Sequence, residues 1–193
     1  METEIYLKKT TKGIAIIFFG LMISNAFGYL TRMLIVRLYG IDDYGLFSLG
    51  NAIVGIAVVI SLLGMNESLA RFISLYLGKR TTEKIKSVIL SSLKLTVPAS
   101  IITAFLVFLF SYHISFTIFN EPKLYPLLWI FALIIPLSVF FTNLTGILRG
   151  FQFMKYKVYT EDITKSLVTI VFVTVFYLFG IGILGVVYAY IIG

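Results

Sequence analysis

The sequence predicts an all-α fold, a polytopic transmembrane helical bundle. Hydrophobic residues make up 59% of the 193-residue chain and charged residues only 13%. A soluble domain of this length could not bury so much apolar surface, so lipid must solvate much of it. The apolar stretches are close to the ~20 residues that a helix needs to cross a bilayer. Most charged residues lie between these stretches rather than within them.

The first predicted helix covers about residues 12–38, after a polar lead at 1–11. At about 100° per residue, one of its sides collects small, polar and finally cationic residues, and the opposite side is apolar. The residues of the polar side are Ser24, Asn25, Gly28, Thr31 and Arg32. Because an ionisable residue inside a membrane costs roughly 3 kcal/mol, this side is expected to face a protein interior or a wet cavity. Alternatively, Arg32 reaches the membrane interface and Asn25 bonds a neighbouring helix.

The second predicted helix covers about residues 44–77 and is uncharged in its first part and amphipathic in its last part. One face of the first part is formed by small and polar residues, which favours close contact with another helix. These residues are Ser48, Asn51, Ala52 and Gly55. In the amphipathic part, Glu67 and Arg71 are spaced i,i+4, and we expect them to form an ion pair.

Further helices are predicted at about residues 87–111, 124–148, 158–179 and 183–193. Pro136 should kink the helix at 124–148. One side of that helix carries small and polar residues, namely Ser138, Thr142, Asn143, Gly146 and Arg149. The helix at 183–193 is too short to span a membrane at ~1.5 Å per residue. We therefore expect a transmembrane lobe at 12–193 whose sixth helix is truncated.

The distribution of positive charge predicts the orientation, because cytoplasmic loops carry an excess of lysine and arginine. With a cytoplasmic N-terminus, the inner segments hold Lys8, Lys9, Lys12, Arg71, Lys79, Arg80, Lys84, Lys86, Arg149, Lys155, Lys157 and Lys165. The outer loops hold only Arg37 and Lys123. We therefore expect a multi-pass protein of the cell membrane with a cytoplasmic N-terminus. The net charge of +7 reflects these inner segments, and no nucleic-acid partner is expected.

Several kinds of site are not expected. The chain has no cysteine, which excludes disulfides, thiol catalysis and cysteine metal sites. The single histidine, His113, has no cluster of carboxylates around it in the sequence, which makes it a poor metal site. We expect no catalytic residue, metal or cofactor.

Four stretches carry a resemblance to a known family: RLYGIDDYGLFSLGNAI, LGMNESLARFIS, GILRGFQFMKYK and GIGILGVVYAYIIG. Together, and in this order, they resemble the polysaccharide-biosynthesis branch of the multidrug/oligosaccharidyl-lipid/polysaccharide exporter superfamily. The chain is similar to the N-terminal half of an oligosaccharide flippase of the O-antigen transporter type. The resemblance extends from about residue 12 to residue 193.

The resemblance implies two six-helix lobes around a central cavity and transport by alternating access, without chemistry on the substrate. It implies that a polyprenyl diphosphate carrying an oligosaccharide moves from the inner to the outer leaflet, for lipopolysaccharide or exopolysaccharide export. The implied substrate-binding residues are Asn25, Arg32, Asn51, Asn143 and Arg149. Arginine offers a planar, permanently charged group to phosphate, and asparagine can bond sugar hydroxyls. The implied partners are membrane lipid, the lipid-linked oligosaccharide, a C-terminal lobe missing from this sequence, and a glycosyltransferase or polymerase.

Two other functions remain open. A cation-coupled multidrug exporter of the same superfamily would need carboxylates inside the membrane. Here the acidic residues fall at helix ends or in loops: Glu2, Glu4, Asp42, Asp43, Glu67, Glu83, Glu121, Glu161 and Asp162. A non-transporting fragment of a broken gene is the other alternative, because the sequence ends within a predicted helix.

Overall fold

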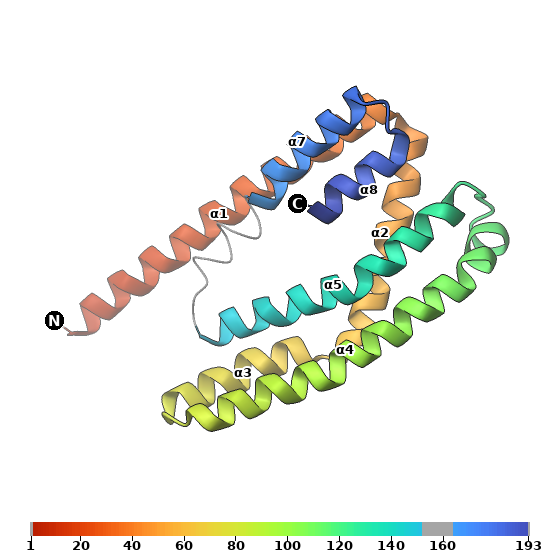
Figure 1. The fold of residues 1–193 in the computed structure, drawn as a ribbon. Helices are drawn as coiled ribbons and strands as arrows, with labels where there is room; N and C mark the ends of the chain where they lie inside the picture. The colour runs from red at the N-terminus through yellow and green to blue at the C-terminus, as the bar shows by residue number, and fades with distance from the viewer. Residues whose placement is uncertain (1, 152–163, 193) are drawn as a thin grey trace. The chain divides into compact units, whose positions relative to one another are not determined.

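A computed structural model describes the backbone of residues 2–151 and 164–192, and in the first helix it describes the side chains of residues 18, 20 and 22 onward. The described residues form helices joined by short turns and loops, without a strand (Figure 1). In order, the helices are α1 (Glu2–Tyr39), α2 (Ile41–Leu62), α3 (Met65–Gly78), α4 (Thr82–His113), the π-helix η1 (Ile114–Ile118), α5 (Leu124–Gly150), α7 (Lys165–Leu178) and α8 (Gly182–Ile192). These confirm the predicted all-α class, and the six-helix lobe stays a prediction.

The chain forms two compact units. Unit 1 joins Met1–Ile41 to Phe153–Gly193 and therefore contains α1, α7 and α8. Unit 2, Asp42–Gln152, contains α2 to α5. Within the described residues, three segments are long and apolar enough to cross a membrane, namely Ile41–Leu62, Thr82–Ile118 and Leu124–Gly150. All three belong to unit 2.

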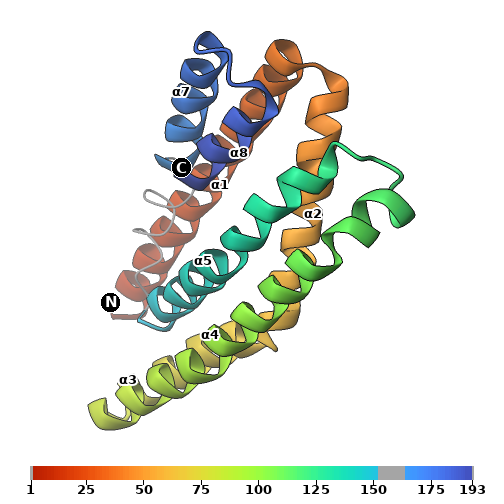
Figure 2. The same ribbon diagram turned by 45° about the vertical axis from the view of Figure 1, so that its right-hand side comes forward.

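In unit 1, α7 lies along α1, and α8 turns back along α7 after Gly180 (Figures 1 and 2). The Tyr39 hydroxyl at the end of α1 donates a hydrogen bond to the Val173 carbonyl of α7, at 3.1 Å. Gly185 allows α8 to approach α7, because a Cβ there would lie 2.8 Å from Cβ of Phe176. The α7 helix begins at Lys165, and the expected start at 158 lies outside the described residues.

The predicted helix at 44–77 is wrong in one respect, because it is divided into α2 and α3. Leu63 and Gly64 adopt positive φ values of 49° and 73°. This left-handed conformation suits glycine, which has no Cβ to clash, and it ends the preceding helix. The apolar run from Leu46 to Met65 predicts one continuous helix, and Gly64 is the local signal for a helix end within that run.

Other helix ends also differ from expectation. The α1 helix begins at Glu2 rather than near residue 12, and α4 begins at Thr82 rather than near 87. In both cases the charged residues predict a boundary at the membrane edge, but lysine and glutamate are good helix formers and the helix continues through them. At its other end, the helix does not stop near 111 but continues as α4 and η1 to Ile118, and Pro122 follows.

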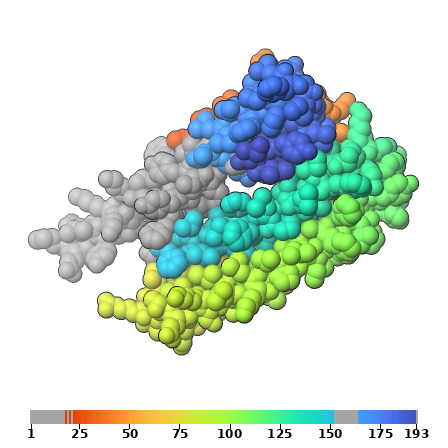
Figure 3. Space-filling view, viewed as in Figure 1, coloured from red at the N-terminus to blue at the C-terminus, as the bar shows by residue number. Residues whose placement is uncertain are grey.

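In unit 2, α3, α4 and α5 lie side by side (Figures 1 and 2). Their shared core contains Leu69 and Ile73 of α3 and Ile85 of α4, with Ile147 and Phe151 packed against it. In the space-filling view, α4 in green and α5 in cyan form a continuous packed surface (Figure 3). The α2 helix contacts α5 where the ring of Phe131 lies against Gly50.

Aromatic side chains gather where α4 and α5 meet their connecting loop. The ring of Trp129 lies 5.1 Å from that of Phe108 and 5.3 Å from that of Tyr125. Tyr112 stacks on Phe116 at 4.6 Å. Trp129 also donates a hydrogen bond from Nε1 to Oγ of Ser111, at 3.3 Å. Because tryptophan and tyrosine favour the membrane–water interface, we expect this cluster at one edge of the membrane.

Candidate functional site

Asn25 and Arg32 lie on the polar side of α1, in unit 1. They are seven residues apart, which places them on one face about 10 Å apart along the helix axis. Both side chains are exposed. Thr31, next to Arg32, donates its hydroxyl back to the Phe27 carbonyl at 2.8 Å. The face is therefore a short row of polar groups that ends in a permanent positive charge.

The other three predicted substrate residues belong to unit 2, and they differ in their surroundings. Asn51 of α2 is half-buried and follows Gly50, which packs against Phe131. Asn143 and Arg149 lie on α5, six residues and about 120° of rotation apart, so they lie at the two edges of the predicted polar side rather than next to each other. The five predicted residues thus fall into separate groups, and each group is described by itself.

Asn143 is completely buried and links α5 to α4. Its Nδ2 donates to Oγ1 of Thr96 at 2.9 Å and to the Val139 carbonyl at 3.0 Å. Its Oδ1 accepts a hydrogen bond from Oγ of Ser92 at 3.0 Å. Both ends of the amide are therefore occupied by protein groups. The substrate-binding role of Asn143 stays a prediction, and it would require these bonds to open.

Sequence reasoning missed the α4 partners of Asn143. Ser92, Thr96 and Ser100 recur every four residues and are all fully buried. This spacing puts three hydroxyls on one side of α4, which is a detectable signal for contact with a polar residue of a neighbouring helix.

Arg149 forms an ion pair across the contact between α3 and α5. Its Nη1 lies 3.0 Å from Oε1 of Glu67. The Arg149 side chain is 23% exposed and that of Glu67 is 77% exposed. The expected partner of Glu67, Arg71, is therefore not the residue that it contacts in the structure. Because i,i+4 spacing relates residues of the same helix, it could not reveal a partner of Glu67 on α5.

Two polar atoms near this ion pair are buried and have no hydrogen-bond partner within the described part of the chain: Nε of Arg149 and Oδ1 of Asn66. Asn66 packs against Gly146, where α3 and α5 come close together. The guanidinium of Arg149 thus has unused donor capacity, and its carboxylate partner is open to water. An anion that reaches this position could compete with Glu67 for Arg149.

A metal site has no support among the residues that the structure describes, because no three acidic or histidine side chains lie close enough to share an ion. His113 is exposed, and its ring lies 6.1 Å from that of Tyr112. Lys94, which lies within the apolar part of α4, is also exposed.

Comparisons with known proteins place the chain in a family. No curated protein and no solved structure gave a match. A family model described as polysaccharide biosynthesis protein matches residues 10–193, which is almost the whole chain. The match agrees with the resemblance carried by the sequence motifs, and the long apolar helices of unit 2 agree with a membrane location. The chain is therefore a membrane protein that belongs to the polysaccharide biosynthesis protein family, with a role in polysaccharide synthesis or export.

Proposed function

We propose that this protein flips a lipid-linked oligosaccharide, carried on a polyprenyl diphosphate, from the inner to the outer leaflet of the cell membrane. The observation that carries the proposal is the match of the polysaccharide biosynthesis family over residues 10–193. The transported glycan would be used for O-antigen, lipopolysaccharide or exopolysaccharide. The protein would act as a transporter and not as an enzyme, by alternating access together with a second lobe.

The polar face of α1 supports a role in holding the substrate head. A diphosphate carries negative charge, and a guanidinium can hold two of its oxygens at once. Arg32 supplies that group on an exposed face, and Asn25 lies about 10 Å away on the same face. That separation suits one residue binding phosphate while the other bonds a sugar hydroxyl. The lipid tail would stay in the bilayer.

The ion pair of Arg149 and Glu67 supports a second contact at the cytoplasmic side. In the proposed topology, the C-terminal end of α5 faces the cytoplasm, where the substrate is made. An arriving diphosphate would displace the exposed Glu67 carboxylate and bond the guanidinium of Arg149. Arg149 would then be a contact for the substrate head at the cytoplasmic side, separate from the contact that Arg32 would offer.

The test is complementation of a host that lacks its own flippase, using the full reading frame and scoring glycan at the cell surface. Wild type should restore export. Arg32→Ala should lower export by an order of magnitude or more, since a charge-assisted hydrogen bond contributes about 1.5–3 kcal/mol. Arg32→Lys should recover only part of it, because lysine cannot bond two oxygens in a plane. Arg37→Ala, an exposed arginine on the same helix, is the matched control and should export normally.

The outcomes separate the alternatives. Normal export by Arg32→Ala, at wild-type amounts of inserted protein, would remove Arg32 from the substrate site and leave it as an interface anchor. Failure of the wild type to restore any surface glycan, combined with export of a cationic dye, would favour the multidrug exporter. Failure in both assays would favour a chain that does not transport.

A further inference from the structure

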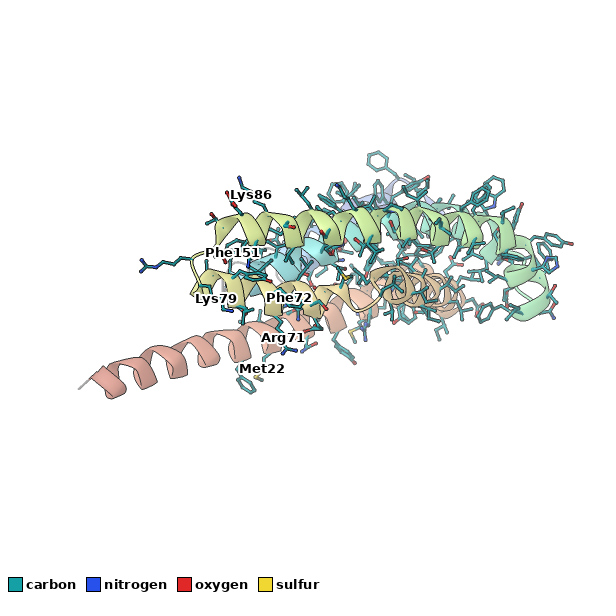
Figure 4. The ribbon with its side chains drawn as sticks, turned by 90° about the horizontal axis from the view of Figure 1, so that it is seen from below. Met22, Arg71, Phe72, Lys79, Lys86 and Phe151 are labelled. Carbon is teal, nitrogen blue, oxygen red and sulfur yellow. The ribbon has the colours of Figure 1, made fainter. Side chains whose placement is uncertain are left out.

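The end of unit 2 where α3 turns into α4 carries a dense group of cations, which we call the basic end. Its members are Arg71, Lys79, Arg80, Lys84 and Lys86, and all five side chains are exposed. Figure 4 shows the labelled Arg71 and Lys79 on the α3 side and Lys86 on the side of α4 away from α3. The cations therefore surround the hairpin rather than line one pocket.

The α3 helix is apolar on two sides. Leu69 and Ile73 are 1% and 0% exposed and form the core with α4 and α5. Phe72 and Leu75 are 43% and 47% exposed and are not part of that core. Figure 4 labels Phe72 on α3. Exposed large apolar side chains next to a ring of cations are typical of a helix that lies among lipid headgroups.

The length of α5 gives the depth of the basic end. Trp129, in the aromatic cluster expected at one membrane edge, and Arg149 are 20 residues apart in α5. This separation is about 30 Å, the thickness of the hydrocarbon core. Arg149 therefore lies at the opposite edge. A Cβ on Gly150 would lie 2.6 Å from Cβ of Ile73, so Ile73 is level with the end of α5. Phe72 and Leu75, on either side of Ile73 in sequence, are then at headgroup depth.

The charge of the basic end is poorly balanced by the acidic residues near it. Glu83 is the acidic residue of the hairpin, and Glu67 is already paired with Arg149. Lys84 lies over the ring of Tyr76 at 5.7 Å, which leaves its charge available. A cluster of four to eight cations beside a membrane attracts anionic lipids. We propose that the basic end binds the headgroups of anionic phospholipids in the cytoplasmic leaflet, with Phe72 and Leu75 inserted beside them.

This inference is independent of the transported cargo, and it requires only that unit 2 spans the membrane. The experiment uses the full-length protein in vesicles. Because this chain has no cysteine, Leu75→Cys can carry a single fluorescent probe at this position in a cysteine-free background. The probe is quenched with brominated phosphatidylglycerol or, in parallel, with brominated phosphatidylcholine.

Brominated phosphatidylglycerol should quench the probe at several-fold lower mole fraction than brominated phosphatidylcholine, and high salt should reduce the difference. Replacing Arg71, Lys79, Arg80 and Lys84 by glutamine should remove most of this preference, so that the two lipids quench the probe at nearly the same mole fraction. Replacing Lys94 and Lys123, which lie outside the basic end, by glutamine is the matched control and should leave the preference unchanged.

Equal quenching by the two lipids in the wild-type protein would overturn the proposal, and so would a probe that neither lipid quenches. These two results need no variant, so a folding defect in the substituted protein cannot obscure them. Loss of the preference in the control variant would also contradict it, because the effect would then follow net charge rather than this surface.

Discussion

The hydrogen bonds of Asn143 predict a stability defect that is distinct from a transport defect. In Asn143→Leu, a side chain of similar size replaces the amide, so the main loss is the pair of bonds to Ser92 and Thr96 of α4. A bond between helices in a membrane contributes about 0.6 kcal/mol on average and up to about 1.7. Asn143→Leu should therefore lower the free energy of unfolding by about 1–3 kcal/mol.

The assay is unfolding of the purified protein in micelles titrated with dodecyl sulfate. The fluorescence of Trp129 reports on the α4–α5 pair, because its indole contacts Phe108 of α4 and Tyr125 of α5. Leu144→Ala changes the exposed neighbour of Asn143 and is the matched control.

A second variant separates a structural role from a substrate role. Replacing Ser92 by alanine and Thr96 by valine together with Asn143→Leu removes both side-chain partners of the amide, so no hydroxyl is left buried without its Asn143 partner and much of the stability should return. Unchanged unfolding of Asn143→Leu would refute the reasoning. If export is lost at unchanged stability, Asn143 is a substrate ligand; if stability and export fall and recover together, it holds α4 against α5.

Two further predictions concern the contact between α3 and α5. Gly150→Ala should lower the free energy of unfolding by about 1–3 kcal/mol, because the new Cβ would lie 2.6 Å from Cβ of Ile73. Gly55→Ala, whose new Cβ would meet no atom within 4 Å, is the control and should have no such cost. Equal free energies of unfolding for the two variants would contradict the close packing at Gly150. In a double-mutant cycle of unfolding, Glu67→Gln and Arg149→Gln should show a coupling of about 0.2–1 kcal/mol, since Glu67 is largely exposed to solvent. Additive effects would mean that the ion pair does not contribute to stability.

The all-helical class and the family could be predicted from the sequence because both depend on features spread over the whole chain. An apolar content of 59% and motifs spread over the whole chain do not depend on any single contact. The bounds of α5, Leu124–Gly150, also lie close to the predicted 124–148, because Pro122 and Gly150 are strong local signals at its two ends.

The helix-to-helix partners could not be predicted. Glu67 contacts Arg149, 82 residues away in the sequence, rather than Arg71 at i+4. The resemblance to the exporter family implies a substrate-binding role for Asn143, on the side of α5 that carries small and polar residues. Its two α4 partners lie 47 and 51 residues away. Spacing within one helix shows which residues share a face, but it does not show which helix covers that face.

The division between α2 and α3 has a mechanical consequence. The α2 helix has 22 residues, about 33 Å at ~1.5 Å per residue, so it has the length of one bilayer core by itself. A continuous helix from Ile41 to Gly78 would act as a lever, in which a small tilt of the span swings its far end. Because Leu63 and Gly64 adopt a left-handed conformation, α3 is a separate helix that packs on α4 and α5 and not an extension of α2. A tilt of α2 is therefore not carried into α3 along one rigid rod, and we expect α2 to adjust to bilayer thickness at this joint.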